Sequence, residues 1–174
     1  MITRLAELQR AAWRWRAQDR AMLSHCFLRP YRADDFEAFA ALNADAAVRR
    51  FVGGPLSQAQ ARERFASLGG GRLQAWAVER AGRYAGHAWL LAPDEQGECE
   101  LGLLIASEHW RQGLGLAVVQ ALRQQAEARG LRVRASVDVE NRACVALLER
   151  AGLRLRGRVA DAEGPYLIYG ELAA

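Results

Sequence analysis

The order of hydrophobic patterns over residues 98–137 constrains the fold more than any other feature of the sequence. Every second residue of 99–105 is apolar, as in a strand. Residues 113–129 follow with a helical stripe that ends at Gly130, and the alternation over 133–137 indicates another strand. A strand–helix–strand unit needs a crossover, so we expect two parallel neighbouring strands.

The patterns outside this unit extend the same sheet. Two helix patterns follow a first short strand, and Asp34 or Asp35 and then Ser57 can cap their starts. Three strand patterns joined by short turns then indicate an antiparallel meander. We therefore expect an α/β (α+β) fold with a mixed, mostly antiparallel sheet of six to seven strands, flanked by helices. The expected strands are 26–28, 74–79, 84–91, 98–106, 133–137, 153–159 and 166–172.

The length of 174 residues suits one domain with a short extension. In residues 1–22, Leu5, Leu8 and Trp15 share one face of a helical pattern that also contains five arginines. We expect this amphipathic extension to dock on the domain, residues 23–174, or on a partner subunit. The first helix and the last strand are candidate contacts for a homodimer.

The composition excludes several classes of function. All 24 basic residues are Arg, so a Schiff-base lysine and a P-loop lysine are impossible. The formal net charge is only +4 and no block of like charge stands out, which argues against a dedicated nucleic-acid partner. No apolar stretch reaches transmembrane length, and the charged first segment is not a secretory signal.

The spacing of cysteine and histidine argues against a disulfide framework and against a metal site. Cys26, Cys99 and Cys144 are widely separated and odd in number, and no CxxC occurs. The three histidines form no metal-ligand pair. We expect reduced thiols in a cytoplasmic protein without a bound metal.

The segment between the strand at 98–106 and the long helix reads WRQGLGLA, residues 110–117. Its two glycines let the backbone turn sharply and approach a ligand closely. The free N–H groups and the dipole of the first helical turn favour an anion, and a pyrophosphate is the natural guest. The third glycine of a dinucleotide fingerprint is missing and no lysine follows, so nicotinamide and P-loop nucleotides are poor matches.

Three segments together resemble the family of GCN5-related N-acetyltransferases (GNAT). Residues 111–117 resemble the family's motif A, and residues 141–153 resemble its helix that begins at an Asn. Glu100-Leu101-Gly102 resembles the fourth strand of the branch that acetylates N-terminal amines of ribosomal proteins, or small amines and antibiotics. The resemblance covers about residues 26–172.

The resemblance implies acetyl-coenzyme A as the cofactor. In this family the central parallel strands splay apart, and pantetheine pairs with the exposed edge of the fourth strand, here residues 103–105. An amide of that edge would stabilise the oxyanion that develops at the thioester carbonyl. The phosphate loop would hold the diphosphate, and Asn141 would contact the cofactor near pantetheine. The implied cofactor-binding residues are Leu103, Leu104, Ile105, Arg111, Gln112, Gly113, Leu114, Gly115, Leu116, Ala117 and Asn141.

Glu100 and Cys144 are the expected catalytic residues. Attack of an amine on a thioester needs a base for the amine and a proton for the leaving thiolate. Glu100, on the strand face opposite Leu101, would be the base, directly or through water; a charge on a solvated face is the alternative. Cys144 would be the acid, its pKa lowered by the first turn of its helix, or else a small buried residue. Tyr166, Tyr169 and water are the other candidate donors.

The resemblance therefore implies an enzyme that transfers acetyl directly to a primary amine. The amine could belong to a protein N-terminus, an amino sugar or a polyamine. Arg49 and Arg50, between the early helices, could recognise an acidic acceptor or form a solvated charge pair. Two alternatives stay open: a non-catalytic acyl-coenzyme A sensor, indicated by Leu148 where many members have Tyr, and an RNA- or ribosome-associated module, indicated by the arginines of residues 1–22.

Overall fold

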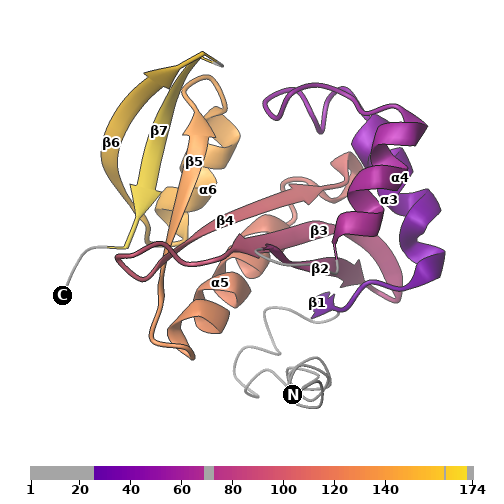
Figure 1. Cartoon of the computed structure of the whole chain (residues 1–174), viewed down its shortest axis with the longest axis horizontal. Helices are drawn as coiled ribbons and strands as arrows, with labels where there is room; N and C mark the ends of the chain where they lie inside the picture. Colours follow the sequence, from indigo (N-terminus) through magenta and orange to yellow (C-terminus); the bar gives the residue numbers. More distant parts are fainter. Residues whose placement is uncertain (1–25, 69–72, 163, 172–174) are drawn as a thin grey trace.

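A computed structural model describes residues 26–68, 73–162 and 164–171 (Figure 1). Seven strands form one sheet in the order β1-β2-β3-β4-β5-β7-β6, flanked by helices, which confirms the expected fold class. The predicted extension, residues 1–22, lies outside the described residues. The strands are β1 (Cys26–Arg29), β2 (Leu73–Arg80), β3 (Arg83–Leu91), β4 (Glu98–Ile105), β5 (Arg132–Asp138), β6 (Arg154–Asp161) and β7 (Gly164–Gly170). The helices are α3 (Phe36–Ala44), α4 (Gln58–Ser67), α5 (Leu114–Glu127) and α6 (Arg142–Arg150), with 3-10 turns η1 (Ala33–Asp35) and η2 (Ser107–His109).

β2, β3 and β4 form the antiparallel meander that the short turns predicted, and β1 pairs antiparallel with β2. In the register of β3 and β4, Trp89 lies opposite Gly102. Opposite residues of an antiparallel pair point to the same face, and so do alternate residues along a strand. Glu100 therefore shares a face with Trp89, whereas Leu101 and Leu103 point to the other face.

The expected parallel pair is β4 with β5, and it is short. Only three residue pairs join the strands, from Glu98↔Arg132 to Glu100↔Arg134. Beyond them β4 continues to Ile105 and β5 continues to Asp138 with no ladder between the two strands. The two halves of the sheet diverge from this point, as the ribbon shows (Figure 1).

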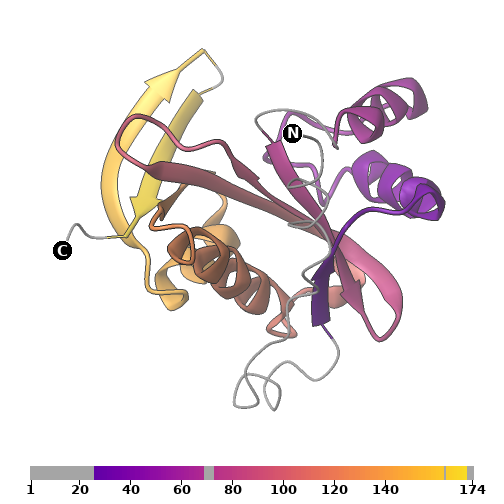
Figure 2. The same cartoon turned by 60° about the horizontal axis from the view of Figure 1, so that its bottom comes forward.

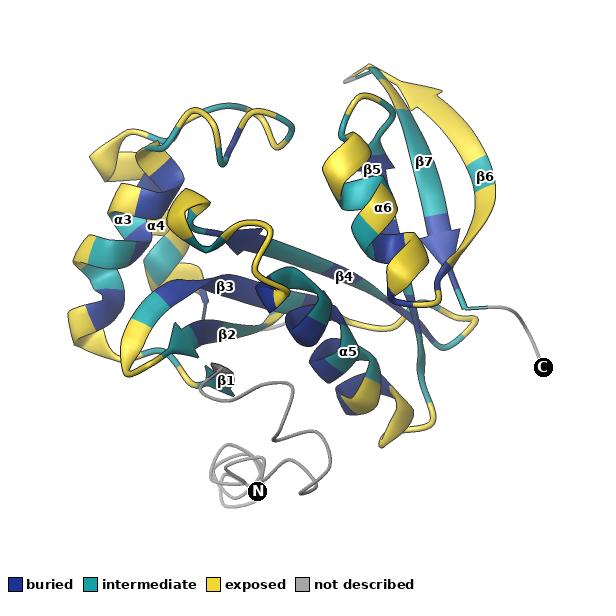
Figure 3. Ribbon diagram, turned by 180° about the vertical axis from the view of Figure 1, so that it is seen from behind, coloured by how far each residue is buried: buried dark blue, intermediate teal, exposed yellow. Residues whose placement is uncertain are grey.

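The chain ends in the expected hairpin, but the last strand is not at the edge of the sheet. β7 pairs with β5 on one side and with β6 on the other. Both edges of β7 are therefore occupied, so this strand cannot extend the sheet by pairing with a second copy. The two edge strands of the sheet are β1 and β6, and β6 is exposed along almost its whole length (Figure 3).

Helices lie on both faces of the sheet (Figure 2), and apolar side chains form a core on each face. The larger core lies between the sheet and helices α5 and α6, and it includes the buried Val118, Leu122 and Leu148. The smaller core lies under α3 and α4 around Phe39 and Phe65. α3 and α4 thus cover the face that carries Glu100, on the opposite side of the sheet from α5.

Local capping signals predicted the starts of α3, α4 and α6 correctly, but only two of the three side chains act as caps. Ser57 Oγ accepts a hydrogen bond from Gln60 N at 3.3 Å at the start of α4, and Asn141 caps α6. The Asp35 carboxylate does not cap α3, because it accepts two hydrogen bonds from the guanidinium of Arg29, each of 2.7 Å. None of the described helices is both long enough and apolar enough to cross a membrane.

Candidate active site

The loop that enters α5 carries a row of backbone N–H groups without partners. Arg111 and Gly113 have positive φ angles of 57° and 81°, so the chain turns sharply there. Ala117 N donates to Gly113 O at 3.1 Å, but the N–H groups of residues 112–116 donate to no described residue. Such groups, together with the helix dipole behind them, favour an anion. Ala117 itself uses its N–H inside the helix.

Gly115 lies where α5 packs closely on α6 and β4. A Cβ at this position would lie 3.2 Å from Leu147 Cδ2 and 3.9 Å from Leu103 Cδ1. A larger residue would therefore push the first turn of α5 away from its neighbours. Glycine at 115 brings the unpartnered N–H groups close to the end of β4.

Side chains brace this loop from both sides. Trp110 Nε1 donates to Ile105 O at 2.7 Å, which ties the loop to the last residue of β4. Gln112 Nε2 donates to Glu108 O at 2.7 Å, and Arg80 Nη1 donates to Gln112 Oε1 at 2.5 Å. The Gln112 side chain thus hydrogen-bonds within the protein at both Nε2 and Oε1, so only the backbone N–H of Gln112 is available to an anion.

The edge of β4 that faces β5 is unpaired beyond Glu100. Ala106 N donates to Ala85 O at 3.0 Å, so Ala106 directs its backbone groups toward β3. Alternation along the strand gives Leu104 the same direction and turns the N–H groups of Leu103 and Ile105 toward the gap. The gap is therefore lined by free donors on one side, next to the loop of residues 112–116.

Glu100 lies where β4 and β5 part, on the face predicted from alternation. The next residue on that face, Gly102, is covered by the ring of Trp89, since a Cβ there would lie 2.1 Å from a ring carbon. The Glu100 side chain is 30% exposed, and its Oε2 lies 3.6 Å from Nη2 of Arg134. Arg134 is missing from the residues predicted from sequence. The alternating apolar pattern of residues 133–137 already places it on the face opposite the core, and this signal could have found it.

Cys144 and Asn141 lie in the first turn of α6, as expected. Asn141 Oδ1 accepts a hydrogen bond from Cys144 N at 3.1 Å. Burial raises the pKa of the Cys144 thiol to about 11. The expectation that the helix N-terminus lowers this pKa is wrong, because removal of the thiolate from water outweighs the helix dipole.

The two tyrosines of the closing hairpin differ in environment. Tyr169 is buried in the main core, and its hydroxyl donates to Glu149 Oε1 at 2.9 Å. Burial and the Glu149 carboxylate raise the pKa of Tyr169. Tyr166 is half-buried and pairs with Asp138 at the far end of β5.

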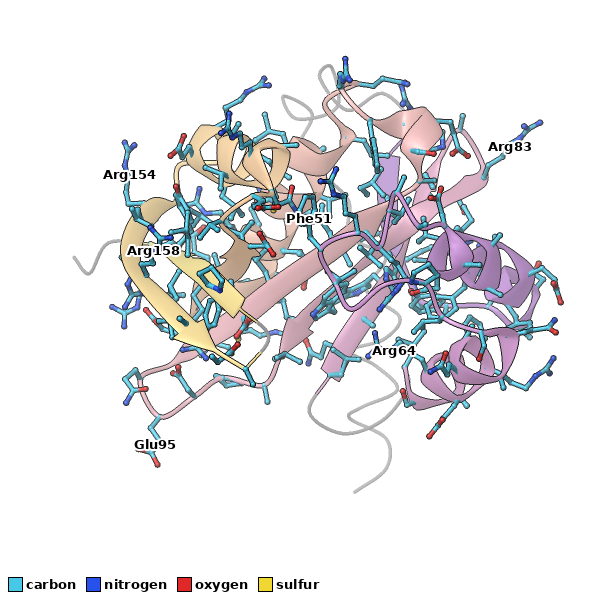
Figure 4. All side chains as sticks on the ribbon, turned by 90° about the horizontal axis from the view of Figure 1, so that it is seen from above. Phe51, Arg64, Arg83, Glu95, Arg154 and Arg158 are labelled. Atoms are coloured by element: carbon cyan, nitrogen blue, oxygen red, sulfur yellow. The ribbon has the colours of Figure 1, made fainter. Side chains whose placement is uncertain are left out.

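The segment between α3 and α4 is held by a buried arginine. Arg49 is only 3% exposed and donates to Asn43 Oδ1 at 3.0 Å and to the carbonyls of Val52 and Gly54, each at 2.5 Å. A solvated charge pair is thus wrong for Arg49. The segment carries Phe51 toward the half of the molecule that contains α6 and β7 (Figure 4).

Parted parallel strands lie beside unpartnered amides at a helix start, and this arrangement suits a ligand with a diphosphate and an extended arm. The sequence comparison names the class of protein: residues 25–154 match the model of the Acetyltransferase (GNAT) domain. The chain belongs to the GNAT family of acetyltransferases, which confirms the resemblance found in the sequence.

Solved structures of low sequence identity share the fold. The spermidine N-acetyltransferase from Vibrio cholerae, in complex with coenzyme A and spermine, has a TM-score of 0.75 at 18% identity, over 85% of this chain and 95% of that chain. RimL, a ribosomal L7/L12 α-N-protein acetyltransferase in complex with coenzyme A, has a TM-score of 0.75 at 19% identity, over 86% and 94%. Aminoglycoside acetyltransferase AAC(6')-Ib in complex with coenzyme A has a TM-score of 0.74 at 17% identity, over 84% and 94%. A comparison with curated protein sequences found no match.

Proposed function

We propose that this chain transfers the acetyl group of acetyl-coenzyme A directly to a primary amine, without an acyl-enzyme. The observation that carries the proposal is the row of unpartnered N–H groups at residues 112–116 beside the unpaired edge of β4. The family of the chain supports the reaction. The coenzyme A in the structures of the spermidine N-acetyltransferase and RimL supports the cofactor.

The described residues fit this cofactor, which supplies the acetyl group as an activated thioester. The N–H groups of residues 112–116 suit a diphosphate, and Arg111 adds a positive charge beside them. An arm that contains amides can pair with the N–H groups of Leu103 and Ile105 as an added strand. The side chain of Leu104 lies on the same face of the sheet as Glu100, opposite the main core. Asn141 lies across the gap, after the end of β5.

Glu100 is the proposed base. A carboxylate beside the acceptor amine can orient the ammonium form and take its proton, directly or through water. Glu100 lies on the face covered by α3 and α4, which is the face opposite the main core. This side of the gap is therefore the proposed side of the acceptor.

Cys144 is the proposed proton donor to the leaving sulfur. A pKa of about 11 keeps its thiol protonated at neutral pH. The same pKa makes it a weaker acid than a free thiol of pKa about 8.5, at a cost of roughly 3 kcal/mol for the transfer. Tyr166 or water is the alternative donor, and Leu148 is fully buried in the core at the position where many members have Tyr.

The test is an assay of thiol release with acetyl-coenzyme A and a panel of primary amines. We expect turnover by the parent and a loss of about 10²- to 10⁴-fold in kcat for Glu100→Gln, with unchanged affinity for coenzyme A. Glu127→Gln, an exposed change at the end of α5, is the matched control and should keep the parent rate. Cys144→Ala distinguishes the thiol from the other donors.

Two outcomes would contradict the proposal. Tight binding of coenzyme A with no turnover of any amine would support the non-catalytic sensor. Equal rates for the parent and Glu100→Gln would remove Glu100 from the site. The RNA-associated alternative depends on residues 1–22, which lie outside the described residues.

We also propose a cytoplasmic location, which Cys99 and Cys144 support because both are free thiols. A homodimer that extends the sheet would use one of its edge strands, β1 or β6, and Leu155 and Val159 are exposed apolar residues on β6.

A further inference from the structure

Arg134 has unused hydrogen-bonding capacity beside the proposed base. Its Nη2 lies 3.6 Å from Glu100 Oε2 and its Nη1 lies 3.4 Å from Asp94 Oδ2. Its Nε is buried without an acceptor. The guanidinium offers five N–H donors in a planar fork that fits a carboxylate, and it donates a hydrogen bond to none of the described residues.

The carboxylates around Arg134 are already matched by arginines. Glu98 Oε1 accepts from Arg156 Nη1 at 2.6 Å and lies 3.5 Å from Arg132 Nε. Asp94 and Glu100 share Arg134. The three carboxylates nearest Arg134 are thus balanced by Arg132, Arg134 and Arg156, whereas a polyamine or an amino sugar with several ammonium groups needs carboxylates in excess.

The helices on the same face add positive charge. Buried Arg49 hydrogen-bonds only to neutral oxygens, and neither Arg49 nor Arg64 of α4 has a carboxylate partner among the described residues. Both arginines act on the sheet: burial is the main cause of the lowered pKa of His87 on β3, and the charges of Arg64 and Arg49 lower it further. Figure 4 shows Arg64 on α4 and Phe51 on the segment between α3 and α4.

We propose that the acceptor is a free α-amino acid, whose carboxylate binds Arg134 while its amine lies at Glu100. In an α-amino acid a single carbon separates the two groups, so they fit neighbouring side chains of opposite charge. A peptide N-terminus lacks this carboxylate, and a polyamine lacks it as well. The inference rests on the proposed function, since it names the acceptor of that same site.

The test compares free amino acids with the corresponding amino acid amides, and with spermidine, as acceptors. Arg134→Gln is compared with Arg132→Gln, a matched change on the same face of the same strand. The side chains are similarly exposed, 37% for Arg134 and 39% for Arg132. Because the amines differ in basicity, the decisive quantity is the ratio of kcat/KM for acid over amide in each protein. We expect this ratio to fall about ten- to hundredfold in Arg134→Gln and to stay at the parent value in Arg132→Gln, as expected for lost hydrogen bonds to a charged group.

The remaining outcomes are distinct. Higher kcat/KM for spermidine than for every amino acid, or an equal fall of the ratio in both variants, would overturn the inference and leave the N-acetyltransferase intact. Absence of turnover with every amine would overturn the proposed function, and the inference with it. The affinity for coenzyme A, measured by calorimetry for each variant, shows whether a variant has kept its fold and its cofactor site.

Discussion

His87 lies on β3 with its ring against the rings of Phe39 and Trp89, at centroid distances of 5.1 and 5.3 Å. Its Nδ1 is 2.9 Å from the hydroxyl of Tyr31. Burial, and then the charges of Arg64 and Arg49, lower the pKa of His87 to about 3. The ring is therefore neutral at physiological pH and packs beneath the proposed acceptor side.

This lowered pKa predicts a pH-dependent stability. Between pH about 6.5 and about 3 the unfolded chain binds a proton at His87 that the folded chain does not. The free energy of unfolding is therefore highest above pH 6.5 and decreases as the pH falls through this range. His87→Gln removes this titration. Urea unfolding should show that the parent loses about 2 kcal/mol more than the variant between pH 7 and pH 5. The same pH dependence in both proteins would contradict the prediction.

Cys144 shows why single side chains are hard to interpret from sequence. Its place in the first turn of a helix is a local feature and is predicted correctly. Its pKa depends on its contact with the main core, which is formed by segments distant in the chain. The same limit applies to Asp35, whose partner Arg29 is fixed by the pairing of β1 rather than by the helix that follows.

The link between the phosphate loop and β4 is a short local contact with a testable role. Trp110→Phe keeps an aromatic ring but loses the hydrogen bond to Ile105 O. We expect the Kd for coenzyme A to rise about fivefold, because one neutral hydrogen bond is worth about 1 kcal/mol. Calorimetric titration measures the change. Trp76→Phe on β2, where no hydrogen bond of the indole is lost, is the control and should keep the parent Kd.

Helices and strands follow closely from the sequence wherever their signals are local. The Ser57–Gln60 capping box starts α4, and the glycine at 130 follows α5. The phosphate loop is also local, because two glycines and a helix start lie within a few residues. The brace from Arg80 to Gln112 spans two distant segments, and no periodicity in the sequence indicates it.

Sequence patterns do not determine the order of all strands in the sheet or where a ladder between two strands ends. The crossover predicts that β4 and β5 are parallel, but the insertion of β7 between β5 and β6 depends on which hydrophobic faces meet in three dimensions. The parting of β4 and β5 after Glu100 came from the family resemblance, since alternation alone does not say where a ladder stops.

The predicted division of the chain at residue 22 has a consequence for the binding of coenzyme A. The family model begins at residue 25, so residues 1–22 lie outside the matched domain. We expect a chain that lacks residues 1–22 to bind coenzyme A within about twofold of the parent Kd, a change of about 0.4 kcal/mol or less. Calorimetry on both chains measures this. A tenfold weaker affinity would show that the first segment contributes to the cofactor site.

The central claim is that the N–H groups of residues 112–116 and the unpaired edge of β4 bind one molecule of coenzyme A. The most direct measurement is an amide NMR titration of the full chain with coenzyme A. The account predicts that the amide signals of residues 112–116, Leu103 and Ile105 shift together, while those of exposed β6 stay in place. No shift at any concentration, or shifts confined to another part of the sheet, would contradict it.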